Sequence, residues 1–448
     1  MDHRATRIQL FSLATNPMRT FHLAWMAFFV CFFAWFAVAP LMPLIRGDLG
    51  LNKDQIANIN IAAVAVTILV RLIIGPLCDR YGPRRTYGWL LLLGAIPVMG
   101  IAFAHSYTSF LLFRLCIGAI GASFVITQFH TSIMFAPNVV GAANAATAGW
   151  GNAGGGATQA LMPLIVTALT YLGVQQSLGW RVAMFVPGIM MLIMSWVYFR
   201  FAKDSPDDAA INTATVRNKG WESFKVAASN YRVWMLFVTY AACFGVELTI
   251  HNMASVYFVD RFSLGLKTAG LYVGCFGLLA LFARALGGIA SDWIACRRGL
   301  DGRTSWLFAL ILAEGLGLTW FAKTGEPQSA FIAMLVFGLF THMACGATYS
   351  LTPFINFKAK GGVAGIIGAG GNVGAVVAGF LMKGAVSTQQ GLITLGTLVI
   401  FSSVCAIAIR FSQAHKMEER SAFAAALASR NSELRTIGSH VVPATEPA

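Results

Sequence analysis

Residues 71–85 read RLIIGPLCDRYGPRR, and residues 284–298 read RALGGIASDWIACRR. In both stretches an arginine is followed by a glycine and an aspartate at steps of four residues, and two arginines close the stretch. A second pair, GNAG at 151–154 and GNVG at 371–374, repeats at nearly the same separation. Paired motifs of this kind predict a chain made of two related halves, an arrangement typical of secondary transporters.

The composition places both halves in a lipid bilayer. Of 448 residues, 57% are apolar and 11% are charged, whereas ordinary soluble domains contain about 25% charged residues. A helix needs roughly 20 apolar residues to cross a bilayer. Twelve such blocks are expected, near 21–45, 56–78, 86–104, 107–134, 140–170, 180–202, 231–258, 267–292, 303–324, 328–356, 362–384 and 390–411. The expected fold class is an all-α polytopic membrane protein with six helices in each half.

Polar stretches between and around these blocks divide the chain. The longest polar connection follows the sixth block and is expected to be a cytoplasmic linker. The predicted organisation is a cytoplasmic segment at 1–20, a six-helix half at 21–202, the linker at 203–230, a second six-helix half at 231–411 and a cytoplasmic tail at 412–448. No cleaved signal peptide is evident, and the first block is expected to stay in the mature chain.

The net charge of +14 comes from lysines and arginines that gather in one set of loops. With both termini in the cytoplasm, seven of the 32 lie in loops on the other side: Arg46, Lys53, Arg181, Arg261, Lys267, Lys323 and Lys383. This positive-inside distribution orients the helices in the cell (inner) membrane. Nucleic acid is therefore not an expected partner. The eight cysteines form no C-x-x-C pair, so no disulfide framework, zinc site or other cofactor is expected.

Glycines accompany an asparagine in both halves. The stretch GWGNAGGGATQ at 149–159 contains the G-x-G-x-x-G spacing of a dinucleotide-binding loop. Such a loop needs a preceding strand in a soluble domain, whereas these glycines lie inside an apolar block, where they let membrane helices approach closely. Close approach does not explain the asparagine. The signature glycines are Gly149, Gly151, Gly154 and Gly155 in the first half and Gly370, Gly371 and Gly374 in the second.

Arg71 and Arg284 each lie about 15 residues into a predicted helix, hence past the bilayer midplane. A central arginine costs at least about 2.5–3.5 kcal/mol, and it stays protonated. An internal ion pair with Glu247 or Glu314 is one explanation. The favoured one is that both guanidinium groups face each other between the halves and bind a small monovalent oxyanion. Arg114, near the start of the fourth block, is expected to be structural or gating.

These motifs resemble those of a known family. Residues 75–85 resemble the loop between the second and third helices of the major facilitator superfamily. AGWGNAGGG and GAGGNVG resemble the paired signatures of its nitrate/nitrite porter family. Three further stretches resemble the assimilatory branch of that family: FHLAW…FAVAPLMPLIR (21–46), FGVELT (244–249) and CGATYSLTPF (345–354). The resemblance covers all twelve expected helices and implies the major facilitator fold.

The resemblance also implies roles for individual residues. The family binds nitrate with two mid-helix arginines, a signature asparagine and aromatic rings, although ordinary core packing is an alternative for each ring. The matching residues here are Arg71, Arg284, Asn152, Tyr240, Phe244, Phe124 and Asn372. The matching gating motif consists of Gly75, Asp79, Arg80, Arg84 and Asp292.

Nitrate transport by alternating access, with nitrite as a further substrate, is the function that the resemblance implies. The two arginines alone give a site of charge +2 when empty and +1 with nitrate, which favours exchange of nitrate for nitrite. The assimilatory branch is proton-coupled, so symport is expected first and exchange second. Glu247 and His251 share one helix face and form the candidate proton-coupling pair, whereas His130 and His342 are expected to be structural.

Two other functions stay open at this point. A porter of small carboxylates such as formate or oxalate also needs arginines, and a transporter-like sensor would bind the anion without moving it. An enzyme is not expected, because the sequence shows neither a metal-ligand cluster nor a nucleophile–base pair. A monomer in the lipid bilayer, with nitrate, nitrite and protons as ligands, is the expected working unit.

Overall fold

The computed structural model describes residues 4–136, 139–206, 219–356, 360–417 and 421. Its first half begins with α1 (Asn16–Phe36), which continues through the 3₁₀ turn η1 (Ala39–Leu41) into α2 (Met42–Leu49). There follow α3 (Lys53–Tyr81), α4 (Pro83–Gly100), η2 (Ile101–Phe103), α5 (Tyr107–Gly118), η3 (Ala119–Ala122), α6 (Ser123–Met134), α7 (Val140–Tyr171), α8 (Gln176–Ala183) and α9 (Phe185–Phe201).

The second half is preceded by α10 (Lys219–Ala228), which lies in the expected linker. The elements of the second half are α11 (Tyr231–Phe262), α12 (Leu266–Leu278), α13 (Ala280–Lys323), α14 (Pro327–Ile355), α15 (Lys360–Leu381) and α16 (Thr388–Ala408). The predicted apolar blocks become helices because a helix satisfies its own backbone N–H and C=O groups in lipid. Residues 207–218 of the linker, and 418–420 and 422–448 of the tail, lie outside the described residues.

Twelve membrane passes account for these helices. Among the described residues, ten helical stretches are long and apolar enough to cross a membrane. One of them, 266–323, has 58 residues and would measure about 87 Å at 1.5 Å per residue, far more than the roughly 30 Å hydrocarbon core. Gly299, at φ 58°, breaks its helical backbone and separates two passes. The nine other stretches, these two passes and the more polar α7 make twelve passes within the described residues, which confirms the expected twelve-helix fold.

Polar residues set where several helices begin. Asn52 and Gln55 form a capping box at the start of α3, in which each side chain accepts a hydrogen bond from the other residue's backbone N–H. Ser106 and Ser387 start α5 and α16 in the same way. These caps satisfy N–H groups that the first turn of a helix leaves without partners.

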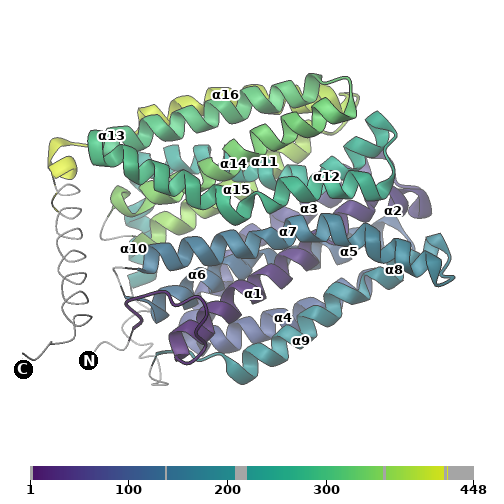
Figure 1. The fold of residues 1–448 in the computed structure, drawn as a ribbon, viewed down its shortest axis with the longest axis horizontal. Helices are drawn as coiled ribbons and strands as arrows, with labels where there is room; N and C mark the ends of the chain where they lie inside the picture. Colours follow the sequence, from purple (N-terminus) through teal and green to yellow (C-terminus); the bar gives the residue numbers. More distant parts are fainter. Residues whose placement is uncertain (1–3, 137–138, 207–218, 357–359, 418–420, 422–448) are drawn as a thin grey trace, which may run out of the picture.

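The two halves lie side by side, with the first half in the lower part of Figure 1 and the second half in the upper part. Helices cross at their boundary in matching ways. α7 packs on α1 of its own half and on α12 of the other, whereas α15 packs on α11 of its own half and on α3 of the other. The fifth helix of each half therefore joins the first helix of its own half to the second helix of the other.

Signature glycines lie at these crossings. A Cβ atom on Gly154 of α7 would collide with the carbonyl oxygen of Phe29 on α1, and one on Gly374 of α15 would collide with that of Ala241 on α11. A larger residue would force the helices apart. The helix α7 runs without a break through 149–159. The stretch with the spacing of a dinucleotide-binding loop is therefore a helix–helix contact.

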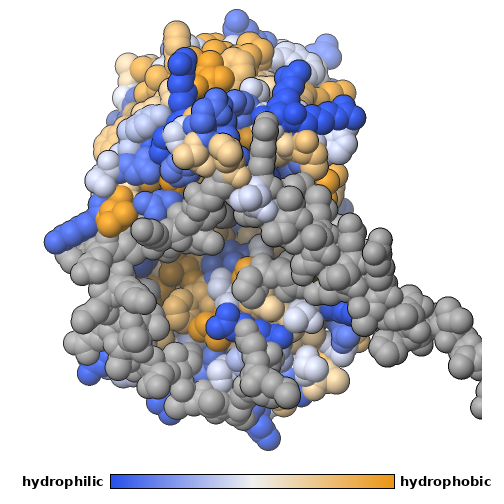
Figure 2. Space-filling view, turned by 90° about the vertical axis from the view of Figure 1, so that its left-hand side faces the viewer, coloured by the Kyte–Doolittle hydropathy of each residue, from blue (hydrophilic) through white to orange (hydrophobic). Residues whose placement is uncertain are grey.

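The two ends of the bundle differ. At the end that carries α10, the surface is hollowed between the halves (Figure 2). At the other end polar contacts join the halves. The guanidinium group of Arg46 in α2 binds the carboxylate of Asp260 in α11 through two hydrogen bonds of 2.6 Å. The Asp54 carboxylate accepts a hydrogen bond of 2.7 Å from the backbone N–H of Gly384. We call this second end the closed end.

Candidate functional site

Arg71 lies on α3 and faces the second half of the molecule. Its Nη1 donates a hydrogen bond of 2.8 Å to the carbonyl oxygen of Gly368 in α15, and its Nη2 donates one of 3.4 Å to that of Gly121. Its Nε is buried without a hydrogen-bond partner. Among the described residues no carboxylate contacts this guanidinium group, so its charge is available to an anion.

Arg284 occupies the corresponding place on α13, but its surroundings differ. Its Nη2 donates a hydrogen bond of 2.5 Å to Oε2 of Glu247 on α11, and the two side chains are 7% and 1% exposed. The internal ion pair considered above is therefore formed, but by only one of the two arginines. Glu314 accepts a hydrogen bond from the hydroxyl group of Thr341 instead.

This ion pair corrects the charge expected for the site. The two arginines and Glu247 together carry a formal charge of +1, and a bound nitrate would make the site neutral. The values expected from the arginines alone were +2 and +1. The sequence offered Glu247 and Glu314 as candidate partners of the arginines, but it could not tell which carboxylate pairs with which arginine, because Glu247 and Arg284 lie on different helices.

Aromatic rings lie over both guanidinium groups. The Cζ atom of Arg71 is 5.7 Å from the ring centroid of Phe124 on α6, and that of Arg284 is 5.5 Å from the ring centroid of Phe244 on α11. Tyr240 stacks on Phe244, with ring centroids 5.2 Å and planes 12° apart. The structure thus brings all three predicted aromatic residues to the arginines, at distances typical of cation–π and stacking contacts.

A fourth ring, at a position that no motif singled out, joins these pairs. Tyr349 on α14 lies edge-on to Tyr240, with ring centroids 5.2 Å apart. Its centroid is 6.2 Å from that of Phe124 in the other half, and its hydroxyl group is buried without a hydrogen-bond partner. Aromatic contacts therefore run continuously from one arginine to the other. The only signal for Tyr349 in the sequence was its place within the stretch 345–354.

The signature glycines give these rings their space. A Cβ atom on Gly371 of α15 would collide with the ring of Phe244, and one on Gly151 of α7 would collide with the ring of Phe28. The centroid of Phe28 in turn lies 5.7 Å from that of Phe124. Each half thus seats a phenylalanine of its first helix against a glycine of its fifth helix. The glycines therefore position the rings that lie over the arginines.

Asn152 and Asn372 are buried beside these glycines. The side-chain Nδ2 of Asn152 donates a hydrogen bond of 2.8 Å to the carbonyl oxygen of Ala148, and its Oδ1 has no partner. Neither polar atom of the Asn372 amide has a partner. Within the described chain no hydrogen bond joins either amide to an arginine. Since buried amides are normally hydrogen-bonded, both have bonding capacity left for a ligand.

The histidine that contacts Glu247 is His342 rather than the predicted His251. The Nδ1 of His342 on α14 lies 3.4 Å from Oε2 of Glu247. His251 packs between the rings of Phe36 and Phe276, and its ring nitrogens have no hydrogen-bond partners. The four-residue spacing does place Glu247 and His251 along one face of α11. The carboxylate, however, contacts groups on α13 and α14, one of which is His342.

The gating motif of the first half anchors a turn to the end of α9. The backbone N–H of Arg84 donates a hydrogen bond of 2.8 Å to the Asp204 carboxylate, and its guanidinium group donates to the carbonyl oxygen of Phe199. Arg80 is exposed, and its guanidinium group lies over the ring of Tyr81. These contacts lie within one half.

The corresponding motif of the second half is held in a similar way. Asp292 on α13 forms an ion pair of 2.5 Å with Arg303, which lies beyond the break in the same helix.

The first-half motif also contains Gly75 and Asp79. A Cβ atom on Gly75 would meet nothing within 4 Å, so close packing does not account for that glycine. The side chain of Asp79 lies outside the described residues.

Arg114 is fully buried and joins the halves towards the closed end. Its Nη1 donates a hydrogen bond of 2.6 Å to the carbonyl oxygen of Trp35, and its Nη2 donates one of 2.9 Å to Oδ1 of Asn252 in the other half. Close by, the side chain of Gln159 on α7 donates one of 2.5 Å to the carbonyl oxygen of His251. This contact between the halves is compatible with both roles expected for Arg114, structural and gating.

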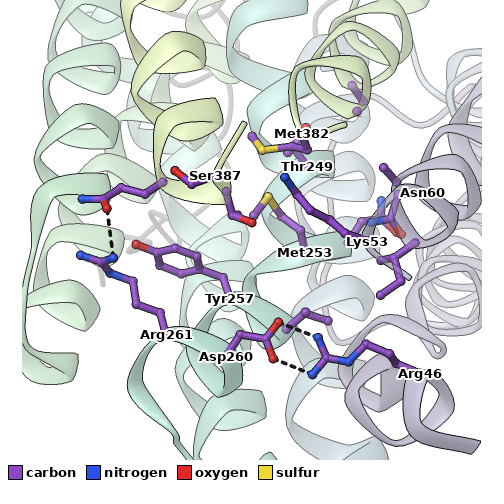
Figure 3. Close-up of a pocket in the computed structure, with 18 of the residues that line it drawn as sticks. Arg46, Lys53, Asn60, Thr249, Met253, Tyr257, Asp260, Arg261, Met382 and Ser387 are labelled. Carbon is purple, nitrogen blue, oxygen red and sulfur yellow. Dashed lines mark hydrogen bonds and ion pairs between the residues drawn. The ribbon is translucent and has the colours of Figure 1, made fainter. Parts of the chain in front are cut away.

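A cavity of about 490 Å³ lies between the halves at the closed end. Side chains from α2 and α3 line it on one side, and side chains from α11, α15 and the start of α16 line it on the other (Figure 3). Arg46, Lys53 and Arg261 bring positive charge to its wall, and Asp260, which pairs with Arg46, brings a negative charge. Thr249 also lines it, two residues along α11 from Glu247. The cavity thus reaches the Arg46–Asp260 ion pair at the closed end.

The chain matches known proteins along most of its length. Residues 24–379 match the family model of the Major Facilitator Superfamily. High affinity nitrate transporter 2.5 of Arabidopsis thaliana is 40% identical over 422 residues, covering 92% of this chain and 83% of the relative. The nitrate/nitrite transporter NrtP of Nostoc punctiforme is 27% identical over 505 residues, covering 96% of this chain and 98% of the relative.

Solved structures share the fold at low sequence identity. A bacterial homolog of the human lysosomal transporter Spinster, in an inward-facing and unoccupied conformation, has a TM-score of 0.71 at 13% identity, covering 91% of this chain and 99% of that chain. The family model, the relatives and the fold agree with the resemblance found in the paired motifs. The chain belongs to the Major Facilitator Superfamily and, within it, to the nitrate/nitrite porter family.

Proposed function

We propose that this protein transports nitrate, and also nitrite, across the cytoplasmic membrane by alternating access. The proposal is carried by Arg71 and Arg284, one from each half, which a continuous set of aromatic contacts connects. Relatives named as nitrate and nitrate/nitrite transporters support the substrate. The superfamily and these relatives are transporters, not enzymes.

The chemistry of the site suits a flat monovalent anion. The edge of a guanidinium group donates two parallel hydrogen bonds to a planar oxyanion, and aromatic rings contact the faces of such an anion. A charge of +1 is neutralised by one nitrate or nitrite. Oxalate, with two charges, would leave the site negative, which disfavours that carboxylate. Formate is planar and monovalent, so it is the competitor to include in experiments.

Alternating access requires the closed end to open. Arg46 must leave Asp260, and Arg114 must leave Asn252, before an anion can enter from that side. The hollow at the end that carries α10 offers a path to the cytoplasm (Figure 2). In this proposal both termini are cytoplasmic, and residues 21–202 and 231–411 move as the two units. A monomer suffices because one chain supplies both arginines.

Proton symport is the favoured mode of coupling. Moving one nitrate inward against an inside-negative potential costs about 2.3 kcal/mol per 100 mV, so two or more protons are needed for the potential to favour uptake. An empty site of charge +1 returns across the membrane at lower electrostatic cost than one of charge +2. The Glu247–Arg284 pair therefore weakens the case for obligatory exchange. Nitrate/nitrite exchange remains the alternative, since the two anions have the same charge.

Liposomes that contain the purified protein test the proposal. Labelled nitrate should accumulate against internal unlabelled nitrate, and Arg71→Lys should abolish this counterflow, because an ammonium group does not reproduce the guanidinium fork. Inward positive current that grows with external acidity indicates symport, whereas electrically silent uptake that requires internal nitrite indicates exchange. Folded wild-type protein that binds nitrate without counterflow would support the sensor function. Faster formate than nitrate flux would support the carboxylate porter.

A further inference from the structure

We infer that Glu247 competes with nitrate for Arg284, and that a proton taken up between Glu247 and His342 releases this arginine to the anion. The inference rests on the proposed function and deepens it, because it names the groups that link nitrate binding to protons. Three features carry it: an incomplete ion pair, two facing acceptor atoms, and the charge of the site.

The ion pair between Glu247 and Arg284 is incomplete in its hydrogen bonds. One link of 2.5 Å joins them, while Oε1 of Glu247 and Nε of Arg284 are buried without hydrogen-bond partners among the described residues. A bidentate pair would use two parallel bonds and occupy both groups. The single link leaves guanidinium donors for a second anion, which the neighbouring carboxylate repels as long as it is charged. Nitrate therefore binds Arg284 more tightly once Glu247 is protonated.

The contact between Glu247 and His342 can hold that proton. The Nε2 atom of His342 lies 3.1 Å from the carbonyl oxygen of Phe276. A carbonyl oxygen only accepts hydrogen bonds, so we assign the hydrogen of the neutral ring to Nε2. The Nδ1 atom is then an acceptor, and it lies 3.4 Å from Oε2 of Glu247, a second acceptor. A proton between these two atoms turns an unfavourable contact into a hydrogen bond.

The surroundings of the ion pair contain further ionisable groups. The titratable and charged groups that face it are Arg284 and Glu314 of α13, His342 and Cys345 of α14, and Tyr240 and His251 of α11. The Cys345 thiol lies 3.8 Å from Oε2 of Glu247, and the ring nitrogens of His251 have no hydrogen-bond partners. The contacts with the Glu247 carboxylate therefore single out His342 as the partner that shares its proton.

The charge of the site fits one nitrate with two protons. The empty site carries +1, and nitrate with one proton on Glu247 restores +1. A second proton on His342 raises the loaded site to +2, one unit above the empty site. An inside-negative potential then drives the loaded site inward. With Glu247 alone as proton acceptor, the cycle would be electrically neutral.

Titration calorimetry at several pH values tests the inference on purified protein. Two protons bound with each nitrate make the wild-type Kd rise by up to about a hundredfold per pH unit on the alkaline side, of which the Glu247 proton contributes about tenfold. In Glu247→Gln, whose amide imitates the protonated acid, this contribution should be lost, which leaves a rise of at most about tenfold per pH unit. Glu314→Gln makes the same change at the other buried carboxyl group and should follow the wild type. A Glu247→Gln variant that keeps the wild-type slope would overturn the inference.

Proton movement in liposomes separates the two histidines. Glu247→Gln should exchange labelled nitrate without moving protons, and His342→Gln should lose the positive current while keeping uptake. His251→Gln should behave as the wild type. Coupling that is lost in His251→Gln but kept in His342→Gln would overturn the assignment. Should a variant fail to fold, calorimetry of the wild type in buffers of different ionisation enthalpy counts the protons bound with nitrate, and a count of zero refutes coupling. Nitrate exchange without protons leaves the proposed function standing, whereas no nitrate exchange at all removes it.

Discussion

The two intramembrane arginines occupy corresponding positions in the two halves, yet their partners differ. Arg71 donates to the backbone carbonyl oxygens of Gly368 and Gly121, whereas Arg284 binds the carboxylate of Glu247. Both halves thus contain the arginine, but within the described residues only the second half contains a carboxylate, Glu247, that pairs with it. A repeated motif therefore places a charge in the bilayer but does not determine which group compensates it.

Removal of the carboxylate should have the largest effect. Glu247→Ala leaves Arg284 as an uncompensated buried charge, and breaking a buried pair in this way typically costs about 3–5 kcal/mol of stability. Thermal unfolding in detergent should show the loss, and added nitrate should recover part of it. Glu314→Ala is the matched control, because its carboxyl group binds the Thr341 hydroxyl group and not a guanidinium group. Equal stability of Glu247→Ala and the wild type would mean that Arg284 does not depend on this pair.

Lysine substitutions compare the two arginines directly. Arg71→Lys should weaken nitrate binding by about 30–150-fold, or about 2–3 kcal/mol, because a charge-assisted bidentate contact is lost. Arg284→Lys should lose less, because Glu247 already offsets the charge at that position. Calorimetry at fixed pH measures both constants. The reverse order of the two losses would place the dominant anion contact on the second half.

The glycine crossings should respond alike in the two halves. Gly154→Ala and Gly374→Ala each bring a Cβ atom into a carbonyl oxygen of the crossing helix, and overpacking of this kind costs about 1–3 kcal/mol. The controls are Gly75→Ala and Gly365→Ala, where a Cβ atom would meet nothing within 4 Å. Thermal stability of the four variants checks this. A large difference between Gly154→Ala and Gly374→Ala would show that the halves differ in packing as well as in charge.

The ion pair at the closed end should have the smallest effect. The side chains of Arg46 and Asp260 are 34% and 45% exposed, and exposed pairs contribute about 0.2–1 kcal/mol. A double-mutant cycle with Arg46→Ala and Asp260→Ala measures their coupling from thermal unfolding. The coupling should shrink in high salt. A coupling as large as the effect at Glu247 would contradict the distinction between the buried and the exposed pair.

The fold and the two arginines could be predicted because few alternatives exist in lipid. Apolar blocks of sufficient length must become helices, and a repeated motif at a constant separation implies two related halves. The aromatic residues Phe124, Tyr240 and Phe244 were predicted only from the family resemblance. In the structure Phe124 and Phe244 lie over the two guanidinium groups, and Tyr240 stacks on Phe244. The helices and the paired arginines could be predicted because each is encoded within a single helix or a single repeat.

The contacts of Glu247 could not be decided from the sequence, because its partners lie on other helices. Helical spacing tells which residues share a face of α11, and it therefore favoured His251. It does not tell which neighbouring helix that face meets, so the pairing with an arginine stayed one alternative among others and the contact with His342 of α14 was not identified. Tyr349 was missed for the same reason, since its contact with Phe124 joins the two halves. Such contacts depend on how the halves dock, which no local pattern records.

The polar character of α7 bears on how the protein is made. Its length suffices for a membrane pass, but α7 is not among the ten helices that are apolar enough to cross alone. Asn152, Gln159 and the glycines lower its tendency to leave the translocon for lipid. The helix α1, on which α7 packs, is synthesised earlier and is strongly apolar. Insertion of α7 is therefore expected to depend on α1 being already in the bilayer, so residues of the proposed anion site would also influence the order in which the helices are inserted.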